Sequence, residues 1–327
     1  TMKTSIILKI ATVAVVMMAI AWPAVAQNVQ KPKYAADVPE FLLTPDKVET
    51  EVLGTLDFFD GMPSKSTVKK TYDFLDLSRG VDAFLNGMPA ASIYAFLEGL
   101  KQAGLEPGDL GITESLLDAR GLLLTAQSTT PYSFVEIDLK NGPVVVEIPG
   151  PVLGILDDAF FRYVSDIGLV GPDQGKGGKY LFLAPDYDSA FGTAAELEAQ
   201  GYIIVPKLDT HDVSFAFRPT LLNGATHAEA GEHAKGIKVY SLEEAVNGEI
   251  EPTEYLDATD LPYESMPYYN MTFIEDINDV VQNNPVREKD RAMYSMLQSI
   301  GIKKDEAFEP TEIQKKAALE GLELAYA

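Results

Sequence analysis

Short apolar runs alternate with tight clusters of glycine, proline and aspartate between residues 125 and 187. Within this stretch, residues of opposite character alternate one by one: Val135, Ile137 and Leu139 are apolar, whereas Glu136, Asp138 and Lys140 are charged. This period of two predicts a β-strand over residues 132–140 with one buried face and one solvent-exposed face. The stretch therefore predicts the β core of the protein.

The dipeptide Asn141-Gly142 follows that strand and is typical of a tight hairpin turn with Gly142 at positive φ. We therefore expect residues 132–140 to pair with a return strand over residues 143–148. Similar apolar runs predict strands at 179–184, 202–205, 213–217 and 237–242. No ten-residue helical pattern separates the early strands, so antiparallel pairing is favoured over a parallel βαβ arrangement.

Helical patterns flank this core on its N-terminal side. Thr44-Pro45-Asp46 resembles a helix start, and Val48, Val52, Leu56 and Phe59 follow it as one apolar stripe. A six-residue motif, Phe58–Pro63, recurs as Phe84–Pro89, and each copy carries the Gly and Pro that are typical of a helix stop and the next helix start. The pattern predicts helical hairpins, with one helix over 66–85 and the next ending at Gly104.

On the C-terminal side, a short helix is expected over 194–200, a polar loop over 224–235 and an acidic, turn-rich segment over 249–267. Apolar stripes then predict three helices: one through 273–281, one from Asn284-Pro285 to Gly301, and a last one opened by Pro310-Thr311-Glu312. The expected fold class is α+β, with an antiparallel, jelly-roll-like β-sandwich between N-terminal and C-terminal helical segments.

The first 26 residues resemble a secretory signal peptide. Lys3 and Lys9 flank the apolar run 10–21, and Ala24-Val25-Ala26 is a small-x-small cleavage signal. We expect cleavage after Ala26 and a location in the periplasm or cell envelope; the alternative is an uncleaved anchor.

The net charge of the chain limits the classes of partner that the protein is expected to bind. The net charge is −23, and removal of residues 1–26, with two lysines and no acids, makes it −25. So acidic a surface repels phosphate backbones and disfavours nucleic-acid binding. The chain contains no cysteine, which excludes disulfides and cysteine-based metal sites.

Candidate chemistry is sparse. Residues 171–178 are glycine-rich but depart from the phosphate-loop pattern and precede a strand, so the alternatives are a plain turn or a nest of backbone N–H groups that binds an anion with Lys176 and Lys179. His227 and His233 are weak metal candidates, because a spacing of six does not place both rings on one helical face.

Several polar residues of the predicted β core are candidates for a pocket or ligand site, and His211 is read as structural. The pocket candidates are Thr130, Tyr132, Asp158, Arg162, Asp166, Asp173, Lys176 and Lys179. Ion pairing, as between Arg162 and its acidic neighbours, is the alternative for the charged ones. No pattern identifies a catalytic residue or a cofactor.

Taken together, the segment LTAQSTTPY, the hairpin DLKNGPVVVEIPG, and the stretches DDAFFRYVSDIG and GPDQGKGGKYL resemble the bacterial family named domain of unknown function 1254 (DUF1254). The resemblance extends over most of residues 44–300. It implies an exported protein with β-sandwich domains and attached helices. It also implies that a second strand-rich domain, numbered 1214, would follow the last helix, whose apolar residues Ile313, Ala317, Leu322 and Leu324 would then lie partly open.

These observations divide the chain into five parts: a signal peptide (1–26), a linker (27–43), a helical lead-in (44–110), the β-sandwich (111–245), and an acidic linker with C-terminal helices (246–327). The leading hypothesis is an exported envelope protein with a binding or structural role, with a small molecule, an envelope component or a second copy as partner. The alternative is an exported enzyme acting on a small molecule in a pocket of the β core. A fold alone does not choose between them.

Overall fold

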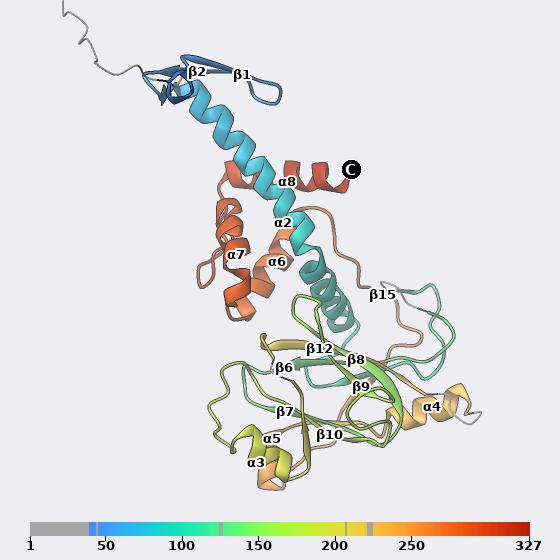
Figure 1. The fold of residues 1–327 in the computed structure, drawn as a ribbon. Helices are drawn as coiled ribbons and strands as arrows, with labels where there is room; N and C mark the ends of the chain where they lie inside the picture. The colour runs from blue at the N-terminus through green and yellow to red at the C-terminus, as the bar shows by residue number, and fades with distance from the viewer. Residues whose placement is uncertain (1–38, 44, 124–126, 207, 221–224) are drawn as a thin grey trace, which may run out of the picture.

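The fold was analysed in a computed structural model that describes residues 39–43, 45–123, 127–206, 208–220 and 225–327. The predicted signal peptide, most of the linker and Thr44 lie outside the described residues. One long helix, α2 (Lys65–Gln102), connects the parts of the molecule. Figure 1 shows a small hairpin at its N-terminal end, helices around its middle and a β-sandwich at its C-terminal end.

The sandwich consists of two sheets. A six-stranded sheet has the order β14-β4-β6-β12-β8-β9, and a four-stranded sheet has the order β11-β10-β7-β13. Their bounds are β4 Leu110–Ile112, β6 Ser133–Asp138, β7 Val144–Ile148, β8 Val152–Asp158, β9 Tyr163–Gly168, β10 Gly178–Phe182, β11 Tyr202–Ile204, β12 Asp212–Pro219, β13 Lys238–Ser241 and β14 Tyr255–Asp257. All pairs are antiparallel except β10–β11 and β14–β4.

Both sheets contribute side chains to one buried core. Val135 and Ile137 of β6 pack there with Val146 of β7, and the large aromatic residues Tyr180 and Phe217 fill the layer. Sheets packed face to face over such a core form a sandwich. The α+β class and the helical terminal segments are therefore confirmed, whereas these strand orders do not confirm jelly-roll-like connectivity.

The expected hairpin between β6 and β7 is wrong. Gly142 has a φ of +126°, as predicted, but β6 pairs with β4 and β12, while β7 pairs with β10 and β13. The turn carries the chain from one sheet to the other. Pro143 lacks the N–H that a ladder would need at the start of the return strand, and each strand finds apolar partners in its own layer.

The helix expected in the N-terminal segment is also wrong. Residues 47–59 form strands β1 (Lys47–Thr50) and β2 (Gly54–Phe59), followed by β3 (Met62–Pro63), and not a helix. Gly54 has a φ of +67°, which reverses the chain and brings Val48 opposite Leu56. The i, i+4 stripe in the sequence thus reflects cross-strand partners. Val52, Phe59 and Met62 are exposed on this hairpin.

Helix α2 runs unbroken through the second copy of the six-residue motif, so the two helices expected there are one. Phe84 is buried against Phe273 and Ile277 of α6 (Met271–Asn283), and Gly87 lies where a Cβ would overlap Ile277. This packing outweighs the hydrogen bond that Pro89 cannot donate inside the helix. The packing of Phe84 on α6 therefore keeps residues 84–89 helical, and the local sequence pattern does not contain this contact.

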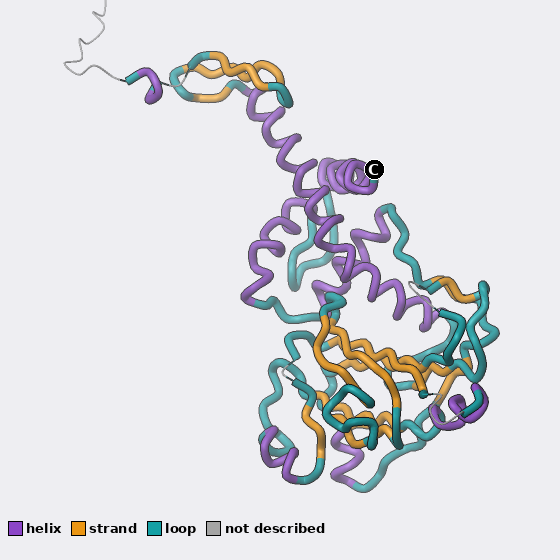
Figure 2. The backbone as a smooth tube through the Cα atoms, turned by 45° about the vertical axis from the view of Figure 1, so that its right-hand side comes forward, coloured by secondary structure: helices purple, strands orange, loops and turns teal. Residues whose placement is uncertain are grey.

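The remaining helices are short. They are η1 Glu40–Leu42, α3 Ala194–Ala199, α4 His227–Ala234, α5 Leu242–Asn247, η3 Glu288–Asp290, α7 Arg291–Leu297, η4 Gln298–Ile300 and α8 Glu312–Tyr326, and a two-stranded sheet joins β5 (Gly121–Leu122) to β15 (Tyr263–Glu264). Residues 227–234 are therefore helical where a polar loop was expected, because Thr226 and Glu229 form a capping box. Figure 2 shows the helices between the hairpin and the sandwich.

The helix expected from Asn284-Pro285 begins later, at residue 288. The Asn284 side chain accepts from the backbone N–H of His211 and donates to Asp212, which ties residue 284 to β12. The helix nevertheless ends at Gly301 as predicted, with a φ of +97°. On α8, Ile313 and Leu324 are exposed, whereas Ala317 and Leu322 are buried. No helix in the described ranges has both the length and the hydropathy of a membrane span.

Helix α8 crosses α2 at two glycines, and this contact generates a prediction. A Cβ on Gly80 would overlap the carbonyl oxygen of Ala317 and approach Gly321. Gly→Ala inside a helix is normally stabilising by about 0.5–1 kcal/mol. We expect Gly80→Ala to destabilise the protein instead, by about 1–3 kcal/mol, because α8 must move away.

Chemical denaturation of the two proteins measures this difference. Asn86→Ala, an exposed position of the same helix, is the matched control and should leave stability within about 0.5 kcal/mol. A more stable Gly80→Ala protein would contradict the crossing.

Candidate functional site

A cavity of about 110 Å³, here called the cleft, lies between the helices and the six-stranded sheet. Helix α2 presents Tyr94, Leu97 and Lys101 to it, and α6 presents Val280 and Asn283. The sheet side consists of Glu136, Asp138, Lys140, Ala159 and Asp212, and Ile93 and Pro107 complete the lining. The helices α2 and α6, which are far apart in the sequence, thus meet the six-stranded sheet at one polar surface.

The charged residues of β6 point into the cleft because of the strand's pleat. Val135 and Ile137 face the sandwich core, so Glu136 and Asp138 face away from it. The sequence predicted a wet face over Glu136, Asp138 and Lys140. That expectation is wrong for Glu136, which is only 8% exposed because α2 and α6 cover it, whereas Asp138 is half-buried and Lys140 is exposed. The helices thus bury one end of an otherwise polar sheet face.

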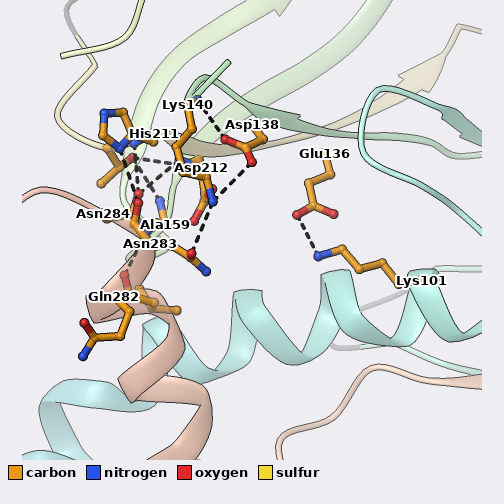
Figure 3. A network of polar contacts seen from close by, with 12 residues as sticks. Lys101, Glu136, Asp138, Lys140, Ala159, His211, Asp212, Gln282, Asn283 and Asn284 are labelled. Atoms are coloured by element: carbon orange, nitrogen blue, oxygen red, sulfur yellow. Dashed lines mark hydrogen bonds and ion pairs between the residues drawn. The ribbon is translucent and has the colours of Figure 1, made fainter. Parts of the chain in front are cut away.

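Two ion-pair groups hold the charges, as Figure 3 shows. The Lys101 ammonium from α2 lies 3.0 Å from a Glu136 oxygen and 3.0 Å from Glu98. The Lys140 ammonium lies 3.2 Å from Asp138 and 4.0 Å from Asp212, and it donates to the Asn283 side chain at 3.2 Å. Carboxylates outnumber ammonium groups in both.

The strand register adds to this imbalance. Asp212 of β12 is directly opposite Asp138 of β6. Like charges at opposed positions of an antiparallel pair are destabilising. Burial raises the pKa of the Asp212 carboxyl, whereas the Lys140 charge and the hydrogen bond from Asn284 lower it. Burial likewise raises the pKa of Glu136, opposed by Lys101. Such perturbed acids in a cleft are characteristic of functional sites.

A second acidic group borders the cleft between α2 and α6. The Tyr94 hydroxyl donates to Asp279 at 2.9 Å, and burial together with Asp279 raises the pKa of that hydroxyl. Burial raises the pKa of Asp276 to about 7, and the negative charges of Asp279, Glu98 and Glu275 contribute to this rise. The two helices therefore meet through several carboxylates at this border.

Beside the cleft, His211 connects the strand to the helix. Its Nε2 lies 3.0 Å from Asp186 and its Nδ1 lies 3.3 Å from the Asn283 carbonyl oxygen. Figure 3 shows the ring next to Asn284 and Asp212. The histidine read as structural therefore supports one wall of the cleft.

None of the pocket candidates predicted from the sequence lines the cleft, and they form separate small groups, of which Asp158 and Arg162 are one. Asp158 accepts from Arg287 at 2.7 Å, and its other oxygen accepts from the backbone N–H of Arg162 at 3.1 Å. Arg162 and Arg287 both contact Asp290, and the Arg287 guanidinium lies 4.3 Å from the centre of the Phe160 ring. This buried cluster attaches β8 to the segment before α7, an ion-paired role.

The other candidates are dispersed. Asp173 occupies the glycine-rich turn itself, where its carboxylate accepts from the backbone N–H groups of Gly168 at 2.8 Å and Gly177 at 3.0 Å and from the Tyr180 hydroxyl. The N–H groups of the supposed anion nest thus have an internal acceptor. Lys176 and Lys179 are exposed beside it.

Asp166 accepts from the exposed Tyr163, and Thr130 is bonded to Gln127. The Tyr132 hydroxyl accepts from the backbone N–H of Gln127 at 3.2 Å, with the Arg218 guanidinium 5.5 Å from its ring. These residues do not line the cleft.

The two weak metal candidates both lie on α4, with His227 at its first position. Nε2 of His233 is buried without a hydrogen-bond partner, beside Gly150. Within the described ranges, no three His, Asp or Glu side chains converge as a metal-binding group.

Larger hollows at the helical end are less suited to specific binding. One of about 530 Å³ is lined by exposed or half-buried residues such as Glu275, Phe308 and Lys315. A site gains specificity from a few placed polar groups in a water-excluded wall. The cleft has both properties and is the candidate functional site.

The fold defines an α+β protein with a two-sheet core and a polar cleft under a long helix. Residues 108–241 match the family model described as "Protein of unknown function (DUF1254)". This match confirms the resemblance noted in the sequence over residues 108–241. The match covers the sandwich from β4 to β13 and leaves out α2 and α6, so only the sheet side of the cleft lies within it.

Three solved chains match this protein. One is the crystal structure of the VPA0106 protein from Vibrio parahaemolyticus, a structural genomics target, with a TM-score of 0.53 and 16% sequence identity. The likeness covers 77% of this chain and 57% of that one, so this chain spans little more than half of its length. At this identity the likeness concerns the fold alone. No curated protein matches the sequence.

The raised pKa of Asp276 gives a prediction for the cleft border. Its folded pKa of about 7 lies above the ordinary value of 3.8 for an aspartate, so the stability that this group contributes is full below about pH 4 and is lost as pH rises through about 7. We expect Asp276→Asn to be more stable than the wild type at pH 8 and equal to it near pH 4. Because water reaches part of this side chain, the gain at pH 8 should be about 1 kcal/mol.

Denaturation midpoints measured at several pH values between 4 and 8 check this expectation. Glu249→Gln removes an exposed acid and serves as the control for net charge. Equal pH profiles for wild type and Asp276→Asn would refute the assignment.

Proposed function

We propose that this protein is exported to the cell envelope and binds a small polar molecule in the cleft. The observation that supports binding is the burial of Glu136, together with the half-buried Asp212, around a cavity with incomplete charge pairing. Buried charges cost free energy unless they are fully paired, so a fold that retains them is using them. The leader-like segment 1–26 supports export.

The same groups support a second candidate, an exported enzyme. Acids whose pKa values are raised by burial act as general acids or bases when a substrate is positioned against them. Here Glu136 and Asp212 have that property. The location differs from the pocket expected inside the β core, because the space between the sheets is filled by side chains such as Phe182 and Phe217.

Export is tested by fractionating cells that express the native leader. We expect a shorter chain, beginning at Gln27, outside the cytoplasm. A variant with Ala24→Leu and Ala26→Leu should remain at full length, because the cleavage signal needs small residues. A full-length wild-type chain retained in the cytoplasm would reject the proposal.

Binding is tested by screening small polar metabolites with ligand-observed NMR and thermal unfolding. Ala159→Leu adds three carbons to the wall of the cleft, and Pro107→Trp places a ring at its exposed mouth. Ala199→Leu, exposed on α3, is the matched control. A ligand of the cleft should lose at least about tenfold in affinity in the first two variants and nothing in the third.

Two outcomes would count against the cleft: no metabolite that stabilises the wild type, or equal binding by all four proteins. Prolonged NMR observation of a bound compound separates the two candidate functions, because an enzyme would convert the compound and a binding protein would release it unchanged.

A further inference from the structure

We propose that the ligand of the cleft is a small organic cation, a primary ammonium on an apolar stem, and that its ammonium group binds beside Glu136, Asp138 and Asp212. This inference rests on the proposed binding function and adds the chemical class of the ligand. Four observations support it: the pairing of the lysines, the state of the acids, the apolar walls and the size of the cavity.

The two lysines of the cleft already have acidic partners. Lys101 contacts Glu98 and Glu136, and Lys140 contacts Asp138 and approaches Asp212. Four carboxylates thus share two ammonium groups. An anionic ligand would have to displace these carboxylates from the lysines, whereas a cation would complete the pairing.

The positions of the acids favour one added positive charge. Asp138 and Asp212 are opposed across β6 and β12, and Glu136 is diagonal to Asp212 in the same register, a spacing of about 7–8 Å between backbones. An ammonium group between them reaches several carboxylates from one point. Burial raises the pKa values of Glu136 and Asp212, and a cation at this point would lower both again.

The opposite wall is partly apolar. Beside the polar Tyr94, Lys101 and Asn283, the helices line the cleft with the buried apolar side chains of Ile93, Leu97 and Val280. Ala159, which follows β8 on the sheet side, is also buried and apolar. Methylene groups of a ligand would lie against them, while its charged end faces the sheet. Since no three metal-ligating side chains converge within the described ranges, the arrangement fits an organic cation better than a bare metal ion.

The volume sets an upper limit on size. A cavity of about 110 Å³ holds on the order of eight water molecules, since each needs roughly 10–15 Å³ by the same measure. A compound with about four to eight heavy atoms fills that space. Polymers and nucleotides exceed it.

The test uses three probes of one shape: butylamine, 1-butanol and butyrate, titrated into the mature chain at neutral pH by calorimetry or ligand-observed NMR. We expect butylamine to bind at least about tenfold more tightly than the other two, a difference of about 1.4 kcal/mol. Glu136→Gln should weaken butylamine about tenfold. Glu249→Gln makes the same change of charge at an exposed position and should have no effect, which separates the cleft from the general attraction of a chain with a net charge of −23.

Asp212→Asn provides a second variant should Glu136→Gln unfold, because an asparagine keeps a contact with Asn284. Tighter binding of butyrate would overturn the inference and assign recognition to the lysines, while the proposed binding function would stand. Equal weakening by Glu136→Gln and Glu249→Gln would also overturn it. If none of the probes binds but the metabolite screen finds a compound that Ala159→Leu excludes, the inference fails and the cleft remains a binding site.

Discussion

The placement of the helices over the sheet depends on how closely neighbouring segments approach helix α2. A Cβ on Gly80 would overlap α8, one on Gly87 would overlap Ile277 of α6, and one on Gly99 would overlap the backbone of Glu264 in β15. Interiors are close-packed, so each contact leaves little freedom for its partner. Because α2 is one continuous helix, these three contacts together fix where Tyr94 and Lys101 lie above the sheet.

The cleft follows from that placement. Glu136, Asp138 and Asp212 would be unremarkable on an open sheet face, where water solvates carboxylates. Under α2 and α6 they are partly or wholly buried, and two of them are opposed in register. Departures from local rules of this kind concentrate at functional sites, because natural sequences otherwise avoid them. This departure is the basis on which we propose the polar network as a binding site.

Local patterns predicted the sandwich strands well and the helical connections less well. Positive φ at Gly142 follows from the residue itself, but its strands pair with sequence-distant partners that a local pattern does not contain. The repeated motif makes the same point. At 58–63 it forms a tight turn, with Asp60 and Gly61 both at positive φ, whereas at 84–89 it lies inside a helix because Phe84 packs on α6.

The site was predicted least well for the same reason. Of its residues, Glu136, Asp138 and Lys140 were visible as one charged strand face. Their contacts with Lys101 and Asn283 were not, because those two residues come from elements outside the strand. Arg162 was expected to pair with its acidic sequence neighbours, but its guanidinium pairs with Asp290, and Asp158 pairs with Arg287. Each of these partners is more than a hundred residues away. In so acidic a chain, a carboxylate in the sequence does not by itself indicate a site, because only the fold shows which carboxylates lie together.

Helix α2 also has a mechanical consequence. With 38 residues it is about 57 Å long, and it carries the β1–β3 hairpin at one end and Lys101 of the cleft near the other. A tilt of about 5° about its cleft end would displace the hairpin by about 5 Å, since a helix of that length acts as a lever. Whatever small rotation the close contacts at Gly80, Gly87 and Gly99 permit would therefore be largest at the exposed apolar tip, where Phe59 and Met62 lie.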